Sequence, residues 1–148
     1  MKTLGLILFS TLLFAVFFAP NLHAEEKRVG DYIVYYNAFN SSFLQPNVAK
    51  TYNISRSGTT GVLNIAIHKA NAENRPDAIS ANVQGRAKNQ LSQFEELAFR
   101  EIKEDSAIYY LADFQFRPKE ETELQFIIRI PGEVEPIELE LDKKFYKD

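Results

Sequence analysis

The stretch TELQFIIRIPGEVEPIELELDKK, residues 122–144, decides the fold because apolar side chains recur in it at every second position. In its first half the apolar phase is Leu124, Phe126, Ile128 and Ile130; in its second half it is Ile137, Leu139 and Leu141. Alternation of this kind is typical of strands with one buried and one wet face. The proline- and glycine-containing segment 131–136 between the halves indicates a turn, so the sequence predicts an antiparallel hairpin.

The same period of two extends toward the N-terminus. Further strands are expected in GDYIVYYNAF (30–39), TGVLNIAIHK (60–69), AISANVQGRA (78–87) and, as a second hairpin, 97–103 with 107–116. Turns are expected at 70–77 and 104–106. Strand 107–116 is apolar on both phases, which is typical of a strand at the centre of its sheet.

About seven strands in one short chain predict an all-β fold, an antiparallel two-sheet sandwich of immunoglobulin-like architecture with one or two short helical turns in the connections. A small up-and-down barrel is the alternative. The Cys–Trp–Cys hallmark of true immunoglobulin domains is missing, since the chain has no Cys and no Trp. Segment 88–99 is the exception to the pattern, because Leu91, Phe94 and Leu97 have the spacing of a short helix.

The first residues have the pattern of an export signal. Lys2 precedes an apolar run from Leu4 to Phe18, Pro20 interrupts it, and Ala24 stands before a charged segment. This order predicts a signal peptide at 1–24, cleaved after Ala24, and a single periplasmic domain at 25–148. The alternative is an uncleaved anchor, although an anchor usually needs about twenty apolar residues.

Composition argues against most catalytic chemistry. The absence of Cys excludes thiol nucleophiles and thiolate metal sites. His68 is the one histidine outside the signal, so a two-histidine zinc site is excluded and any triad would depend on His68. No phosphate-binding glycine loop or calcium loop is present. We therefore expect no enzyme activity, no cofactor and no metal.

The charge pattern gives little indication of a partner. The formal net charge is −3, and acids flank the only basic cluster, at 143–147. We therefore expect no nucleic-acid partner, and no membrane contact after cleavage. The oligomeric state stays open.

The longest expected connection is YYNAFNSSFLQPNVAKTYNISRS, residues 35–57. Pro46 suits the first turn of a helix, so a short helix is expected at 46–52. One interpretation is a packed connection that passes from one sheet to the other and caps the core. The other is a lid or pocket with a binding surface formed by Tyr36, Asn40, Ser41, Ser42, Asn53 and Arg56; loops on a rigid sandwich often carry binding residues.

The chain resembles a family of small secreted proteins of Gram-negative bacteria known only as a domain of unknown function. The resemblance lies in GDYIVYYNAFNSSFLQPNVAKTYNISRS (30–57), GVLNIAI (61–67) and LAFREIKEDSAIYYLADFQF (97–116). The segments AFNSSFLQP and FREIKEDSAIYYLA carry the resemblance most specifically. The resemblance implies a periplasmic location and a sandwich fold, and no functional residues.

Three functions follow as hypotheses. The first is a non-catalytic periplasmic binding or accessory module that engages an envelope protein through a sheet edge or the connection. The second is a small-ligand carrier whose aromatic residues line a pocket between the sheets or under the long connection. The third is a carboxylate-dependent hydrolase, for which the acids are poorly placed because most fall on the polar phase of strands.

Overall fold

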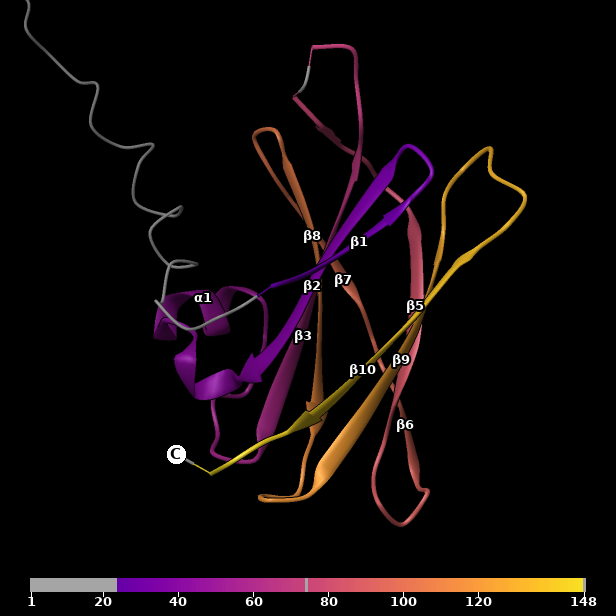
Figure 1. The fold of residues 1–148 in the computed structure, drawn as a ribbon. Coiled ribbons are helices and arrows are strands. Elements are labelled where there is room, and N and C mark those ends of the chain that lie inside the picture. Colours follow the sequence, from indigo (N-terminus) through magenta and orange to yellow (C-terminus); the bar gives the residue numbers. More distant parts are fainter. Residues whose placement is uncertain (1–23, 74, 148) are drawn as a thin grey trace, which may run out of the picture.

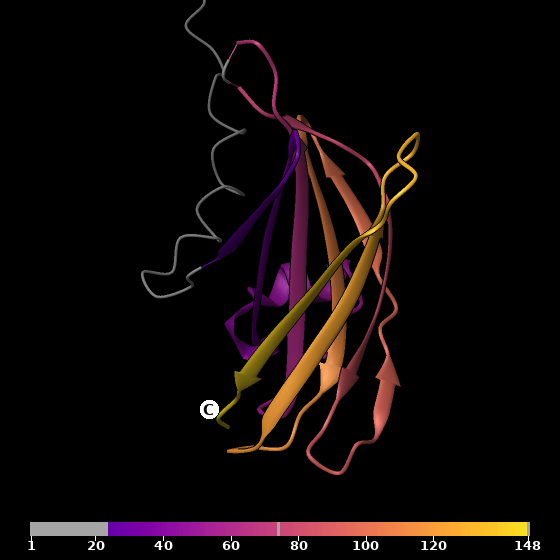
Figure 2. The same cartoon turned by 45° about the vertical axis from the view of Figure 1, so that its right-hand side comes forward.

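The computed structural model describes residues 24–73 and 75–147, which form two antiparallel β-sheets packed face to face (Figures 1 and 2). The first sheet has the order β1-β2-β3-β8-β7, with β4 paired to β3, and the second has the order β10-β9-β5-β6. The strands are β1 (Glu25–Val29), β2 (Tyr32–Asn40), β3 (Thr60–Lys69), β4 (Asp77–Ala78), β5 (Asn82–Lys88), β6 (Phe94–Glu96), β7 (Arg100–Glu104), β8 (Ala107–Gln115), β9 (Glu121–Arg129) and β10 (Ile137–Lys144). The expected all-β sandwich is confirmed.

The main core lies between the sheets. The inward phases of β2, β3 and β8 meet those of β9 and β10, and Phe114 and Phe126 are almost completely buried there. The rings of Tyr36 and Phe126 bridge the two sheets with centroids 5.3 Å apart. Gly61 faces Phe114 across the β3–β8 register, and a Cβ at this position would lie 2.4 Å from the ring. The core is therefore packed tightly enough to require a glycine.

Both expected hairpins are present. In the C-terminal hairpin, Leu139 pairs with Phe126 and Leu141 with Leu124, so the alternating apolar residues share one face. In the second hairpin, β7 pairs with β8 around the expected turn at 104–106, where Asp105 has a positive φ of 49°. As predicted from its two apolar phases, β8 lies inside its sheet, between β3 and β7.

The strands differ from expectation in three details. The described residues form ten strands where about seven were expected, and two of the ten, β4 and β6, have only two and three residues. The short helix expected in 88–99 is instead β6, a three-residue strand paired with β5. The expected strand 97–103 begins later, at Arg100, because residues 97–99 join β6 in the second sheet to β7 (Arg100–Glu104) in the first. The chain changes sheets at this point, and Leu97 is buried in the core between them.

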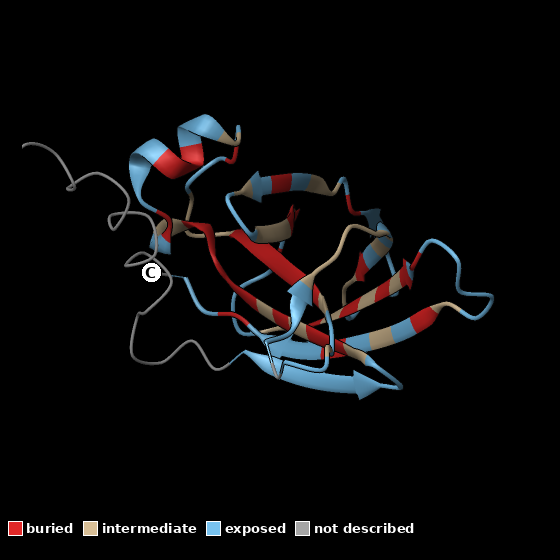
Figure 3. Cartoon of the chain, turned by 90° about the horizontal axis from the view of Figure 1, so that it is seen from above, coloured by how far each residue is buried: buried red, intermediate tan, exposed pale blue. Residues whose placement is uncertain are grey.

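The long connection also differs from expectation. Its two helical turns, η2 (Ser41–Phe43) and α1 (Pro46–Thr51), lie between β2 and β3, which are neighbours in one sheet. The expected helix at Pro46 is confirmed, with Pro46 in its first turn. The expectation that the connection passes from one sheet to the other is wrong, because the connection joins β2 and β3, which pair directly in one sheet. The connection folds back over the outer face of the first sheet (Figure 1), and α1 carries both buried and exposed residues (Figure 3).

Of the predicted signal at 1–24, residues 1–23 lie outside the described residues. Within the described part of the chain, no helix has the length and apolar character needed to cross a bilayer.

Candidate ligand pocket on the outer face of the first sheet

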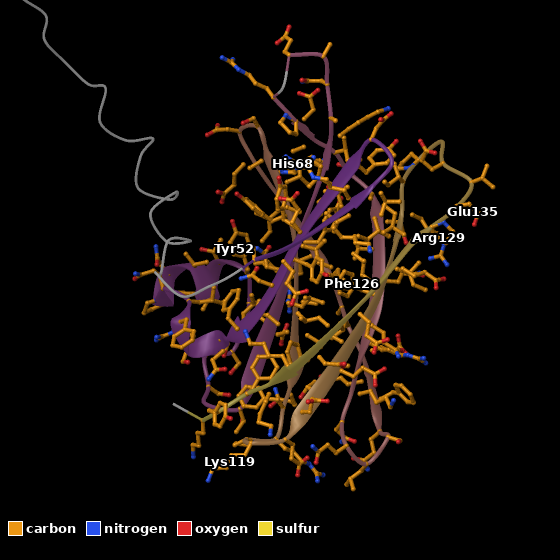
Figure 4. The ribbon with its side chains drawn as sticks, viewed as in Figure 1. Tyr52, His68, Lys119, Phe126, Arg129 and Glu135 are labelled. Carbon is orange, nitrogen blue, oxygen red and sulfur yellow. The ribbon has the colours of Figure 1, made fainter. Side chains whose placement is uncertain are left out.

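A pocket of about 300 Å³ lies where the connection leaves part of the outer sheet face uncovered. Its floor comes from β2, β3, β7 and β8, and its wall comes from the connection. The outward residues of these strands carry the side chains that border it. Figure 4 shows Tyr52 beside α1, on the connection side of this region.

Strand register explains the hollow in the floor. Tyr35 pairs with Ala66 on neighbouring strands, and Asn37 pairs with Asn64 one step along the same face. Tyr109 comes from β8, where it pairs with Ile102. Ala66 has the smallest of these side chains, so the larger residues around it leave a depression. All six residues border the pocket.

The wall is a second apolar cluster on the outer face of the sheet. Leu44, Val48, Ala49 and Ile54 of the connection pack on Phe39, Val62, Ile102 and Leu111 of the strands. The positive φ of Asn53, 53°, turns the chain after α1, and the amide of Ile54 donates to the carbonyl of Ala49. Phe43 stands at the edge of the pocket with 61% of its surface exposed.

One end of the pocket carries a carboxylate. The hydroxyl of Tyr52 donates a hydrogen bond of 2.7 Å to Oε1 of Glu104. Burial, this bond and the charge of Glu104 together raise the pKa of Tyr52 to about 12. Burial, with a smaller contribution from the Glu104 charge, also raises the pKa of Tyr109. Both tyrosines thus remain neutral hydroxyls at physiological pH.

The floor contains a polar atom without a partner. Nδ2 of Asn64 lies 3.4 Å from Oδ1 of Asn37, a long hydrogen bond, while Oδ1 of Asn64 is buried and accepts none. Asn64 is 9% exposed. Among the described residues, the only other buried side-chain atom in this state is Oε2 of Glu120. Buried polar groups without a partner are uncommon, so this oxygen needs an explanation.

Of the six binding residues predicted from the sequence, three are buried structural residues. The ring of Tyr36 borders the pocket but packs between the sheets against Phe126. Asn40 donates from Nδ2 to the carbonyl of Tyr146. The Ser41 hydroxyl donates to the carbonyl of Ser55 and accepts from the amide of Ser57, which fastens the two ends of the connection.

The other three predicted residues lie away from the pocket lining. Asn53 and Arg56 are exposed, and Arg56 donates to the carbonyl of Ser42 at 2.8 Å. This bond joins the start of the connection to its end. Ser41, Ser42 and Arg56 thus brace the connection. Tyr36 is the one predicted residue that borders the pocket.

Sequence reasoning missed the residues that form the pocket. Tyr35, Ala66 and Tyr109 lie on phases that alternate with the main core. The two apolar phases of β8 were a signal that the outer face is also covered. His68, expected on the surface, borders the pocket and packs edge-to-face on Tyr35 with centroids 5.4 Å apart.

One acidic group elsewhere could meet a cation. Carboxylate oxygens of Glu123, Glu140 and Asp142 lie within 4.8 Å of one another on the second sheet. Glu123 already forms an ion pair of 2.8 Å with Lys88, and Glu140 and Asp142 are exposed. This arrangement matches an ordinary solvated charge cluster.

The fold and the pocket together define a class: an antiparallel β-sandwich whose long β2–β3 connection covers the outer face of one sheet beside a hollow. Within that class, the chain belongs to the DUF4426 family, a domain of unknown function whose family model matches residues 26–148. The family resemblance seen in the sequence is confirmed.

Solved structures agree with this assignment. A DUF4426 family protein from Pseudomonas aeruginosa is 34% identical with a TM-score of 0.71, and the match covers 84% of this chain and 96% of that one. FetP of uropathogenic Escherichia coli, expressed in the periplasm of its host, is 12% identical with a TM-score of 0.59, over 84% of this chain and 96% of that one. A copper-bound variant of FetP is 13% identical, with a TM-score of 0.56 over 83% and 95% of the two chains. The likeness to FetP shows the fold alone. Among curated proteins, none matches the chain.

Proposed function

We propose that this protein is a non-catalytic binding module that holds a small, largely apolar ligand in the pocket beside the β2–β3 connection. The observation that carries the proposal is a preformed aromatic hollow outside the main core. Of the two binding roles expected from the sequence, this geometry favours the small-ligand carrier, with its pocket under the long connection rather than between the sheets.

Size and lining support a small ligand. A volume of about 300 Å³ is at the lower end of the range for small-molecule sites. It has room for about ten water-sized groups. Aromatic side chains with a few polar groups are the usual lining of such sites. The bordering aromatic residues are Tyr35, Phe39, Phe43, Tyr52 and Tyr109.

The exposed position of Phe43 supports the same role. A large apolar side chain with 61% of its surface exposed gains little from folding at that position. At the edge of a pocket it gains contacts when a ligand enters, because exposed apolar surface commonly marks a binding site. Phe43 would then pack over the bound molecule.

The proposal includes no reaction. Tyr52 is the polar side chain closest to a catalytic arrangement, since its hydroxyl contacts a carboxylate. With a pKa of about 12 it keeps its proton at neutral pH, so it donates hydrogen bonds and does not act as a nucleophile. Glu104 in this pair orients Tyr52 and supplies charge to the pocket.

The proposed location is the periplasm. The pattern of residues 1–24 and the family resemblance support it. N-terminal sequencing of the protein recovered from a periplasmic fraction of a Gram-negative host is expected to give Glu25 as the first residue. Recovery of the full chain with Met1 in the membrane fraction would contradict this location.

Mapping small-molecule binding by NMR tests the pocket itself. Small aromatic and apolar compounds are titrated into the exported protein, and we expect shifts at the amides of Asn64, Ala66 and Tyr109. Ala66→Trp fills the hollow and is expected to abolish these shifts. Ile127→Trp, on the outer face of the second sheet, is the matched control and should leave them unchanged. Absence of binding by every compound, or binding that survives Ala66→Trp, would overturn the proposal.

A further inference from the structure

The side chains bordering the pocket have an unequal balance of charge. Among the described residues that border it, Glu104 is the only acid, His68 is the one basic residue, and no Lys or Arg is present. We propose that the ligand is a small organic cation, that is, an ammonium group on an apolar body; this inference rests on the proposed function. The ammonium group would lie at Glu104 and the apolar body over Ala66.

The Glu104 end of the pocket can receive such a group. An ionised carboxylate has about four acceptor positions, and the bond from Tyr52 takes one of them. The rings of Tyr52 and Tyr109 border the same end. A cation near aromatic rings is attracted by their electron-rich faces, and this attraction is stronger where water is displaced. Two tyrosine side chains thus lie beside the negative charge of Glu104.

Asn64 provides independent support. Its Oδ1 is a buried acceptor with no donor, in the floor of the same pocket. The buried oxygen needs an N–H or O–H group, and the neighbouring protein side chains do not supply it. An amine ligand carries N–H groups that can donate such a hydrogen bond. This oxygen is almost fully buried, so a ligand donor would reach it only if the Asn64 side chain rotated toward the pocket.

The same residues disfavour an anion. A carboxylate or phosphate in the pocket would lie near the charge of Glu104 with no Lys or Arg side chain in the lining to compensate. Like charges at close range in a partly desolvated site cost free energy. A neutral ligand avoids that cost but leaves the carboxylate without a counter-charge. A cation at the Glu104 end complements that charge.

Three probes of matching shape test the charge preference: 2-phenylethylamine, 2-phenylethanol and phenylacetate. Each is titrated into the exported protein by NMR at pH 8, where the alkyl amine of the first probe is protonated. We expect the amine to bind about tenfold more tightly than the alcohol, and the acid to bind most weakly.

Two matched variants locate the effect. Glu104→Gln keeps an acceptor for Tyr52 and removes the charge, so the affinity for the amine should fall about five- to tenfold while the affinity for the alcohol is unchanged. Glu101→Gln makes the same change on the same strand, where Glu101 accepts from Tyr110 on the opposite face of the sheet. It should leave all three affinities unchanged.

The outcomes separate the two proposals. Equal affinities for the three probes, a preference for the acid, or an amine affinity unchanged by Glu104→Gln would overturn the cation inference and leave a pocket for neutral or other ligands. Failure of all three probes to bind at their solubility limits would overturn the cation inference too. The broader compound titration with Ala66→Trp then decides the proposed function separately.

Discussion

The two faces of the first sheet carry two apolar clusters with different coverings. The inner face meets a second sheet, and Phe114 and Phe126 there have at most 1% of their surface exposed. Within the described part of the chain, the outer face is packed by the β2–β3 connection, which covers part of it and leaves a pocket of about 300 Å³. A sheet covers a sheet completely, whereas a short connection covers only the residues it reaches. The incomplete cover is what makes room for a ligand.

The largest expected effect is in the inner cluster. Phe114→Ala removes a fully buried ring that faces Gly61, and we expect it to lower the free energy of unfolding by about 3–5 kcal/mol. Urea denaturation of the wild type and the variant measures the difference. A loss below about 1 kcal/mol would mean that the sheets are not closely packed.

A smaller effect is expected in the outer cluster. Leu44→Ala removes a buried contact between the connection and the sheet, and we expect a loss of about 2 kcal/mol, at the low end for such changes. The adjacent Phe43→Ala is the matched control: its ring is 61% exposed, so stability should change by less than about 0.5 kcal/mol. Both are measured by urea denaturation. Equal losses for the two variants would contradict the described packing of the connection.

The smallest effect is a pH dependence in the pocket wall. Folding raises the pKa of Tyr52 from its ordinary 10.0 to about 12, so the folded state keeps a proton that the unfolded state loses between these values. The extra stability is complete below pH 10 and is lost as pH rises toward 12. With Tyr52 partly exposed, we expect the loss to be about 1 kcal/mol.

Urea denaturation measures this contribution of Tyr52 to the free energy of unfolding. The wild type and Tyr52→Phe are compared at pH 9 and pH 11.5. The stability advantage of the wild type over Tyr52→Phe should shrink at the higher pH. Tyr146→Phe, at an exposed tyrosine, corrects for the other effects of alkali. An advantage that stays constant would show that the bond to Glu104 does not hold the proton.

Much of the fold follows from local sequence patterns. Alternation identified β9 and β10, two apolar phases placed β8 inside its sheet, and Pro46 marked the start of α1. Strand β1 was missed because its residues EEKRV are all exposed and have no apolar phase. β6 was read as helical because three apolar residues happened to have helical spacing.

A pocket under the long connection was one hypothesis from the sequence, but the residues on its floor could not be predicted because they depend on pairing between distant strands. Tyr35, Ala66 and Tyr109 meet only when β2, β3 and β8 adopt their register, and a shift of one residue would reverse every side chain. The sequence indicated polar residues in the connection as the binding surface. Those residues instead hold the connection in place, as the bonds of Ser41 and Arg56 show.

The stability of two tryptophan variants tests the contrast between the faces most directly. Ala66 and Ala112 are both buried alanines in the interior strands of the first sheet, one in the outer pocket and one in the inner core. We predict that Ala66→Trp changes the free energy of unfolding by less than about 1 kcal/mol, whereas overpacking by Ala112→Trp costs about 3 kcal/mol or prevents folding. Equal losses for the two variants would contradict the account, because they would show that the outer face has no hollow.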